Sequence, residues 1–150
     1  MYSNTRYSKY FYAKEFNNVK PDLLLLDVLN QLRTKVECPV IITSSTRTIE
    51  QHISLYKKLE KENKLNGKKW HEAIPWGSRH LSQYNKDLRA VDFKVLKCKE
   101  TNKFLTGEEI YVFLKEIEYS TKIYLGIGIG KFHCHVDIDR NKSTVWKYNY

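Results

Sequence analysis

The chain has 150 residues, 41% of them hydrophobic and 13% aromatic, which suits one globular domain spanning residues 1–150. This composition excludes a disordered chain, and the longest apolar run, Leu23 to Leu26, is far too short to cross a membrane. The net charge of +9 favours polyanions such as nucleic acid or anionic cell-wall polymer. The lysines are scattered and build no arginine-rich arm, so abundant lysine alone also explains the charge, and we do not expect a nucleic-acid partner.

The N-terminal residues and the cysteines bear on the compartment. No apolar segment follows the first six residues, so no secretory signal is visible, and we expect synthesis in the cytoplasm, with any export depending on other proteins. Cys38, Cys98 and Cys134 are odd in number, widely spaced and form no Cys-x-x-Cys pair. They predict neither a disulfide framework nor a thiolate zinc site, and we interpret them as small buried apolar residues.

The chain begins with a predicted aromatic arm, a helix and a buried strand. Residues 1–16 form the arm, which we expect to pack through its aromatic side chains. Pro21 begins a helix that ends before Pro39. The core-facing residues of this helix follow helical spacing: Leu25, Val28, Leu29, Leu32 and Val36. A short buried strand over residues 40–43 leads into a polar turn at 44–48, a position that commonly carries function.

A second helix and a long loop follow this turn. The helix is expected from Ile49 to Asn63, with His52 on its surface. Its inward positions are Ile49, Ile53, Tyr56 and Leu59. The loop, residues 68–87, shows no clear period, and loops of this length are more often functional than idle. It contains several residues that could serve a site: Trp70, His71, Pro75, Trp76, Gly77 and His80.

The second half of the chain predicts four more strands and one more helix. The strand 89–95 has Ala90, Asp92 and Lys94 on one face and Val91, Phe93 and Val95 on the other. Thr106 opens a capping box, Thr-Gly-Glu-Glu, at the start of the third helix. A strand with a glycine-rich turn covers 123–130, and a final strand covers 144–150. No helix follows the glycines, so they do not form a nucleotide fingerprint and instead indicate a tight bend or a close backbone approach.

The stretch from Phe132 to Asp139 alternates with a period of two. One face of the predicted strand is apolar: Phe132, Cys134, Val136 and Ile138. The other face is made of two imidazoles and two carboxylates: His133, His135, Asp137 and Asp139. Imidazole nitrogen and carboxylate oxygen are ligands that zinc accepts, so this face could form the wall of a metal site. An ordinary edge strand with a polar solvent face is the alternative.

Two further residues could complete such a site. His80 lies in the long loop and Asp92 on the following strand, and together with His135 they make a trio. A catalytic zinc takes three protein ligands and keeps one open position, whereas a structural zinc is closed by four. His71 lies in the same loop as His80, and its role stays open.

Five short motifs now carry a resemblance over nearly the whole chain. They occur in this order: Ser-x-x-Arg-Thr at 44–48, Ser-Arg-His-Leu at 78–81, Ala-Val-Asp-Phe at 90–93, Gly-Ile-Gly at 126–128 and Phe-His-Cys-His-Val-Asp at 132–137. The chain resembles the family of zinc D-Ala-D-Ala carboxypeptidases and phage L-alanyl-D-glutamate endolysins, whose fold is shared with the hedgehog signalling domain. The resemblance implies an α+β domain, with a small antiparallel sheet, helices packed on one side and zinc at the open face.

The resemblance also implies a ligand set and a reaction. His80, Asp92 and His135 would hold Zn²⁺, and Arg47 would bind substrate and stabilise the transition state, because a guanidinium grips a carboxylate or oxyanion without losing its proton. The implied activity is hydrolysis of a peptide bond in peptidoglycan stem peptides, by a phage or prophage protein that acts on the cell wall when other proteins release it. We expect a monomer.

Two departures from the family pattern concern the ligands and the base. Eleven residues, Leu81 to Val91, separate His80 from Asp92, and none is glycine, whereas the family has a shorter segment that contains one. Many members carry an acidic base three residues before the last histidine, where this chain has Phe132. Asp137 is then the expected base, or an orienting partner of His135, with His133 as helper. The alternative is a catalytically degenerate module that binds wall peptide or protein.

Overall fold

The structure, a computed structural model, describes residues 5–75, 78–81, 88–98 and 102–150. Its helices and strands follow in the order η1 (Ala13–Phe16), α1 (Leu23–Val36), β1 (Val40–Ser44), α2 (Ile49–Lys61), α3 (Trp70–Ala73), β2 (Ala90–Val95), α4 (Gly107–Thr121), β3 (Gly126–Ile129), β4 (Cys134–Asp137) and β5 (Thr144–Lys147). Trp76, Gly77 and residues 82–87 of the long loop lie outside the described residues.

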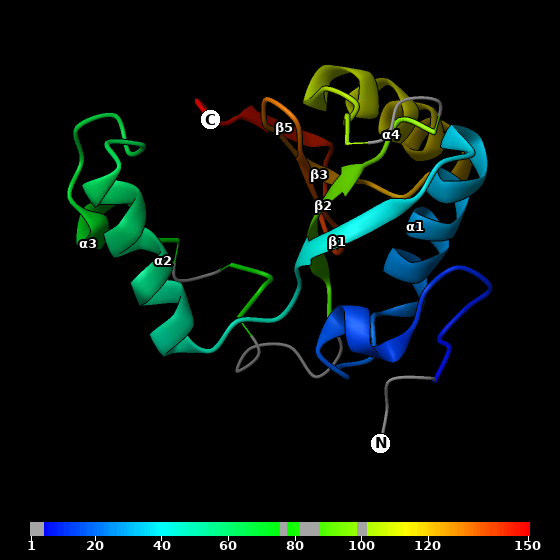
Figure 1. Cartoon of the computed structure of the whole chain (residues 1–150), viewed down its shortest axis with the longest axis horizontal. Helices are drawn as coiled ribbons and strands as arrows, with labels where there is room; N and C mark the ends of the chain where they lie inside the picture. The colour runs from blue at the N-terminus through cyan, green and yellow to red at the C-terminus, as the bar shows by residue number, and fades with distance from the viewer. Residues whose placement is uncertain (1–4, 76–77, 82–87, 99–101) are drawn as a thin grey trace.

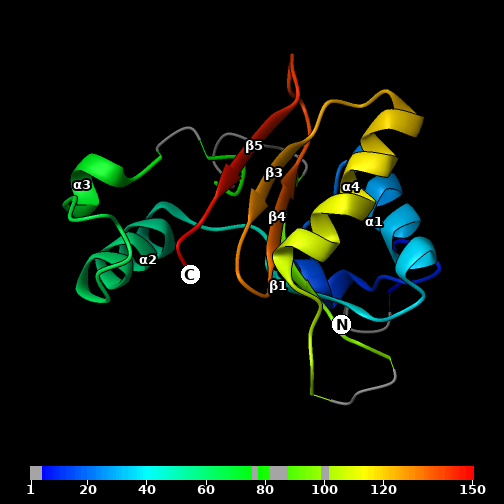
Figure 2. The same ribbon diagram turned by 90° about the horizontal axis from the view of Figure 1, so that it is seen from above.

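The five strands form one sheet in the order β1-β2-β4-β3-β5. The pairings β1–β2, β2–β4 and β3–β4 are antiparallel, and β3–β5 is parallel. The predicted α+β class with a small antiparallel sheet is therefore confirmed, with one parallel pairing at the β5 edge. Figures 1 and 2 show α1 and α4 side by side on one side of the sheet, while α2 and α3 extend away from the opposite side.

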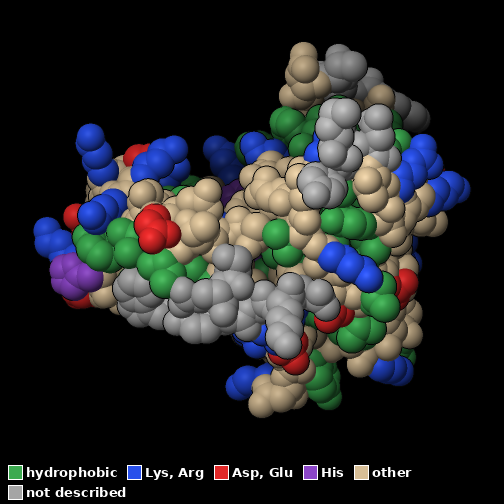
Figure 3. Space-filling view, turned by 90° about the horizontal axis from the view of Figure 1, so that it is seen from below, with side chains coloured by type: hydrophobic (Ala, Val, Ile, Leu, Met, Phe, Trp, Pro, Cys, Tyr) green, Lys and Arg blue, Asp and Glu red, His purple; other side chains and the backbone are tan. Residues whose placement is uncertain are grey.

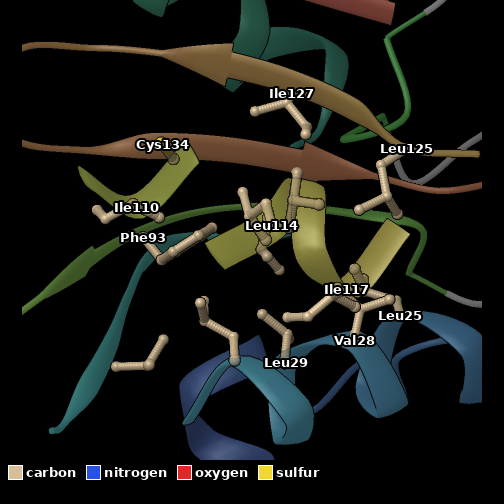
Figure 4. Close-up of a cluster of buried hydrophobic side chains, with 14 of the residues drawn as sticks. Leu25, Val28, Leu29, Phe93, Ile110, Leu114, Ile117, Leu125, Ile127 and Cys134 are labelled. Carbon is tan, nitrogen blue, oxygen red and sulfur yellow. The ribbon is translucent and has the colours of Figure 1, made fainter. Parts of the chain in front are cut away.

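The core lies between the sheet and the pair α1–α4. Leucine and isoleucine side chains of the two helices meet the apolar face of β2, β3 and β4 in Figure 4. The fully buried residues of this core include Leu25, Val28, Leu29, Leu32, Val91, Phe93, Val95, Ile110, Leu114, Ile117, Leu125, Ile127, Cys134 and Val136. The N-terminal arm joins this core through Phe11 and Phe16, as predicted. Phe132 was expected on the apolar face, but it precedes β4 and is 44% exposed.

Polar residues at the helix starts explain where the helices begin. The Asp22 side chain accepts a hydrogen bond from the Leu24 backbone N–H, which caps α1. Thr48 and Thr106 each open a capping box, in which the threonine accepts from the third helical N–H and a Gln or Glu side chain accepts from the threonine N–H. The box at Thr106 confirms the predicted start of the third helix.

Two predictions about single residues are wrong. His52 was expected on the surface, but its side chain is fully buried, because its Nε2 lies 3.0 Å from the Pro75 carbonyl oxygen and its ring packs on Tyr56. Cys38 and Cys98 were expected as small buried apolar residues outside any disulfide, but they form a disulfide across a sequence separation of 60 residues, and Cys98 is exposed. The start of β1 pairs with the end of β2, and this pairing brings the two cysteines together. Cys134 is a buried free thiol, as expected.

The surface shows scattered positive charge. In Figure 3, Lys and Arg side chains are spread over several parts of the visible face, with acidic side chains between them. This distribution agrees with the scattered lysines of the sequence. None of the helices in the described part of the chain has the length and apolar character that a membrane crossing requires.

Candidate metal centre

His80, Asp92 and His135 meet on the face of the sheet opposite the core. Asp92 of β2 and His135 of β4 are direct cross-strand partners, so their side chains leave the sheet on the same face. His80 arrives from the loop after α3, where its carbonyl oxygen accepts a 2.7 Å hydrogen bond from the Arg47 N–H. The polar turn after β1 therefore holds the loop histidine over the sheet. The insertion after His80 has not removed it from the trio.

The three potential ligand atoms form a compact triangle. His80 Nε2 lies 3.1 Å from His135 Nδ1 and 3.4 Å from Asp92 Oδ1, and the latter two atoms are 3.0 Å apart. Three corners of a tetrahedron with metal–ligand bonds of about 2.0–2.1 Å would be about 3.3 Å apart. The residues present therefore fit one small metal ion with three protein ligands.

Both imidazoles are held in the tautomer that a metal needs. Nδ1 of His80 lies 2.6 Å from the Ser45 carbonyl oxygen, and because a carbonyl only accepts, this nitrogen carries the proton. Nε2 of His135 likewise donates to Asp137 Oδ2 at 2.6 Å. The remaining nitrogens, Nε2 of His80 and Nδ1 of His135, therefore turn their lone pairs toward the Asp92 carboxylate. Three acceptors that converge in this way favour a positive charge between them, which a metal ion or a proton on His135 Nδ1 would supply.

The pKa values of the trio reflect the same arrangement. Burial lowers the pKa of His80 despite the nearby Asp92 carboxylate. Burial also opposes charge on His135, but its hydrogen bonds to Asp137 and Asp92 raise the pKa of this imidazole above its usual value. Burial would raise the pKa of Asp92, and yet the two histidines hold it well below its usual range. The site therefore favours a carboxylate facing a cation.

Asp137 is fully engaged on the far edge of the His135 ring. Besides His135 Nε2, its two oxygens accept from Arg140, whose Nε and Nη2 lie 2.5 Å and 2.7 Å away. Burial opposes ionisation, but these bonds lower the pKa of Asp137 to about 2. Gly126 makes room for this pair, because a Cβ there would lie 2.4 Å from the Asp137 Oδ1. Asp137 was the expected base or orienting partner, and its contacts are those of an orienting partner.

His133 and Arg47 both line the cleft that contains the trio. The half-buried His133 ring stacks on Tyr148 and Tyr150, with ring centroids 5.5 and 5.7 Å apart. Burial lowers the pKa of His133, so the ring is neutral at neutral pH. The Arg47 Nε is buried without a hydrogen-bond partner among the described residues. Arg47 is therefore a cation with donor capacity left for a ligand.

The cleft encloses about 480 Å³ between the sheet and α2. Its walls contain aromatic residues that the sequence analysis did not select, namely Tyr56 of α2 and Trp146, Tyr148 and Tyr150 of the last segment. Trp146 lies closest to the trio, with its ring centroid 5.1 Å from that of His135. The alternation of aromatic residues at 146, 148 and 150 was the signal that could have indicated this wall. His71, by contrast, is exposed on α3, away from the cleft lining.

Compared with protein-family models, with curated proteins and with solved structures, the chain gives no match. The family resemblance of the sequence and its likeness to the hedgehog and D,D-peptidase fold therefore stay predictions. The class of site is defined by geometry alone: three protein ligand atoms for one metal ion at the base of an open cleft.

Proposed function

We propose that this chain is a zinc-dependent hydrolase that cleaves a peptide bond in peptidoglycan stem peptides. The observation that carries the proposal is the triangle of His80 Nε2, His135 Nδ1 and Asp92 Oδ1, with both imidazoles held in the metal-binding tautomer. The substrate class comes from the resemblance of the five motifs to wall peptidases. Three protein ligands in an open cleft support a catalytic metal, because a structural zinc is enclosed by four.

Zinc is the ion that the donor set favours. Two imidazole nitrogens and one carboxylate oxygen suit a borderline cation, whereas calcium and magnesium prefer oxygen ligands alone. The ligand separations of 3.0–3.4 Å also suit a small tetrahedral ion. Zinc bound here would polarise the scissile carbonyl and lower the pKa of water toward ~7.

The residues around the trio take separate roles in this proposal. Asp137 fixes the orientation of His135, because Arg140 and His135 occupy its oxygens. His133 is a neutral imidazole that lines the cleft, and it accepts the proton that leaves the attacking water. Arg47 grips a substrate carboxylate or the oxyanion with its planar guanidinium. Proton transfer thus falls to His133 and charge neutralisation to Arg47.

A binding module without catalysis is the second candidate, and one observation favours it. Among the described residues of the cleft, the two carboxylates are Asp92, which faces the metal site, and Asp137, which is held by Arg140. Neither is free to act as the acidic base that wall peptidases of this type carry. A module of this kind would bind wall peptide through zinc and Arg47 and release it unchanged.

An assay on purified peptidoglycan distinguishes the hydrolase from the binding module. We expect the zinc-loaded chain to release D-Ala or stem-peptide fragments, detected by mass spectrometry, and to stop doing so after a chelator removes the metal. Zinc added back should restore release. The variant His80→Ala should be inactive, whereas His71→Ala, which alters an exposed histidine of α3, should act like the unmodified chain. Zinc-dependent binding of peptidoglycan without release of any fragment would support the binding module and refute the hydrolase.

A further inference from the structure

The last strand brings two aromatic residues next to the metal ligands. Trp146 pairs with Gly128 across β5 and β3, Gly128 pairs with His135, and His135 pairs with Asp92. These four residues form one row across the sheet, and side chains of directly paired residues share a face. Tyr148, two residues further along, lies on the same face as Trp146. Both side chains line the cleft.

Glycine at position 128 lets the polar atoms of this pair lie directly on the sheet. A Cβ at Gly128 would be 2.7 Å from Trp146 Nε1 and 2.8 Å from the Tyr148 hydroxyl oxygen. Both atoms therefore occupy the space that a side chain at 128 would take. Cβ positions of directly opposed residues are about 5 Å apart, so the Tyr148 hydroxyl occupies the position of this row beside His135.

Trp146 lies against Tyr148 but cannot accept its hydroxyl hydrogen. The Trp146 and Tyr148 rings meet edge to face, with centroids 6.4 Å apart, and the indole N–H is a donor only, so it offers no acceptor to the Tyr148 hydroxyl. The hydroxyl hydrogen of Tyr148 must then be directed elsewhere. The described residues provide it with no acceptor, and the ring lines the cleft. Tyr148 is half-buried, so its hydroxyl can donate to a ligand oxygen that enters the cleft.

We propose that Tyr148 is a further catalytic residue, whose hydroxyl donates a hydrogen bond to the ligand oxygen bound beside His80, Asp92 and His135, with Trp146 as its positioning residue. The catalytic part of this assignment rests on the proposed hydrolase function, in which the oxygen is that of the scissile carbonyl. A fixed donor is worth most where negative charge develops, so the bond strengthens as the carbonyl carbon becomes tetrahedral and its oxygen gains negative charge. A purely structural tyrosine would use its ring alone and would not need the hydroxyl.

Removal of the hydroxyl alone tests this role. In the zinc-loaded protein, Tyr148→Phe should keep the metal content and KM and lower kcat by about 100-fold, the effect of deleting one such donor. Trp146→Phe should lower kcat less, because the phenol remains but loses part of the ring contact that orients it. The matched control is Tyr124→Phe, which removes a hydroxyl from a residue that is 53% exposed and outside the cleft lining. Equal kcat for Tyr148→Phe and Tyr124→Phe would overturn the inference and leave the hydrolase proposal intact.

A binding measurement decides the matter even without hydrolysis. The Co²⁺-loaded protein can be titrated with inorganic phosphate and followed by its visible absorption. We expect Tyr148→Phe to weaken phosphate binding about 10-fold, as the loss of one hydrogen bond to an anion predicts, and Tyr124→Phe to leave it unchanged. If the unmodified chain cuts no peptide but Tyr148→Phe still shows this loss of phosphate affinity, the hydrolase proposal fails and the donor assignment stands. Equal phosphate affinity in both variants refutes the donor.

Discussion

His135 lies between two carboxylates that have different partners. Asp92 faces its Nδ1, where the other potential ligand atoms converge, and Asp137 accepts from its Nε2 while Arg140 holds both Asp137 oxygens. A carboxylate that fixes the tautomer of a ligating histidine typically contributes 10–100-fold to metal affinity. The position of Asp137 is thus better suited to strengthening the ligand than to moving protons.

Loss of the Asp137 carboxylate tests its role as the orienting partner of His135. Asp137→Asn should weaken zinc binding by about 10–100-fold, because an amide is a poorer acceptor for His135 Nε2–H and a poorer partner for Arg140. Zinc affinity can be measured by competition with a chromophoric chelator. If the variant keeps full zinc affinity and loses turnover, Asp137 is the base that the sequence suggested.

Replacement of His80 should remove the metal. His80→Ala deletes one of the three ligand atoms, and two remaining protein ligands hold zinc poorly. Elemental analysis after reconstitution should give one zinc per unmodified chain and none in the variant, with the fold checked by circular dichroism. His71→Ala is the control and should keep its zinc. The reverse pattern would show that the loop supplies a different histidine.

Arg47 is expected to act on the ligand and not on the fold. Arg47→Lys should keep the fold and the zinc but lower kcat/KM by about 100-fold, because a point charge cannot reproduce a planar pair of donors. The unpartnered Nε in the cleft is the structural reason. Unfolding of the variant, seen by circular dichroism, would assign Arg47 a structural role instead, and normal turnover would remove it from the site.

At the scale of elements, the sequence predicts the helices and strands whose apolar residues repeat at a regular spacing without interruption. The stripes of α1 and α4 and the alternation of β2 correspond to the buried side chains of the structure. His52 was placed wrongly because helical spacing shows which residues share a face but does not show what covers that face. The hydrogen bond from Arg140 to Asp137 likewise depends on the turn after β4, which places the Arg140 side chain against Gly126. Residue alternation alone does not reveal this turn.

The capping box of α4 allows an element-scale prediction. The Thr106 side chain accepts from the Glu109 N–H at 3.1 Å, and α4 carries three fully buried residues of the core. Thr106→Ala should lower the free energy of unfolding by about 1 kcal/mol, measured in urea. Thr34→Ala is the control, because Thr34 lies exposed near the end of α1 and caps no N-terminus. Equal losses in the two variants would contradict the role of the cap.

The candidate site could be predicted in part. Strand alternation placed Asp92 and His135 on polar faces, whereas His80 lies in a loop without a period of its own, and its choice over His71 depended on the order of the motifs. The aromatic wall of residues 146–150 was missed because a terminal strand rich in Tyr and Trp is equally consistent with core packing. Its place beside the metal ligands depends on the parallel pairing of β5 with β3, and non-adjacent strand pairing is not encoded in a local pattern.

For the whole molecule, the disulfide is the main long-range covalent link. Cys38–Cys98 closes a segment of 60 residues that contains β1, α2, α3 and β2. A crosslink over such a loop typically stabilises a protein by about 2–4 kcal/mol, mostly by restricting the unfolded chain. The double variant Cys38→Ser, Cys98→Ser should lose about this amount in urea unfolding. Reducing agent should destabilise the unmodified chain equally and leave the variant unchanged. Reducing agent without effect on the unmodified chain would contradict the link.

The order of the strands separates two kinds of residue in space. Strands β2 and β4, which carry Asp92 and His135, lie inside the sheet with a paired strand on each side. Strand β5, which carries Trp146 and leads to Tyr148, lies at the edge. Substitutions on an edge strand disturb one neighbour instead of two. The cleft wall can therefore diversify over evolution, and its ligand preference with it, while the metal ligands remain in place.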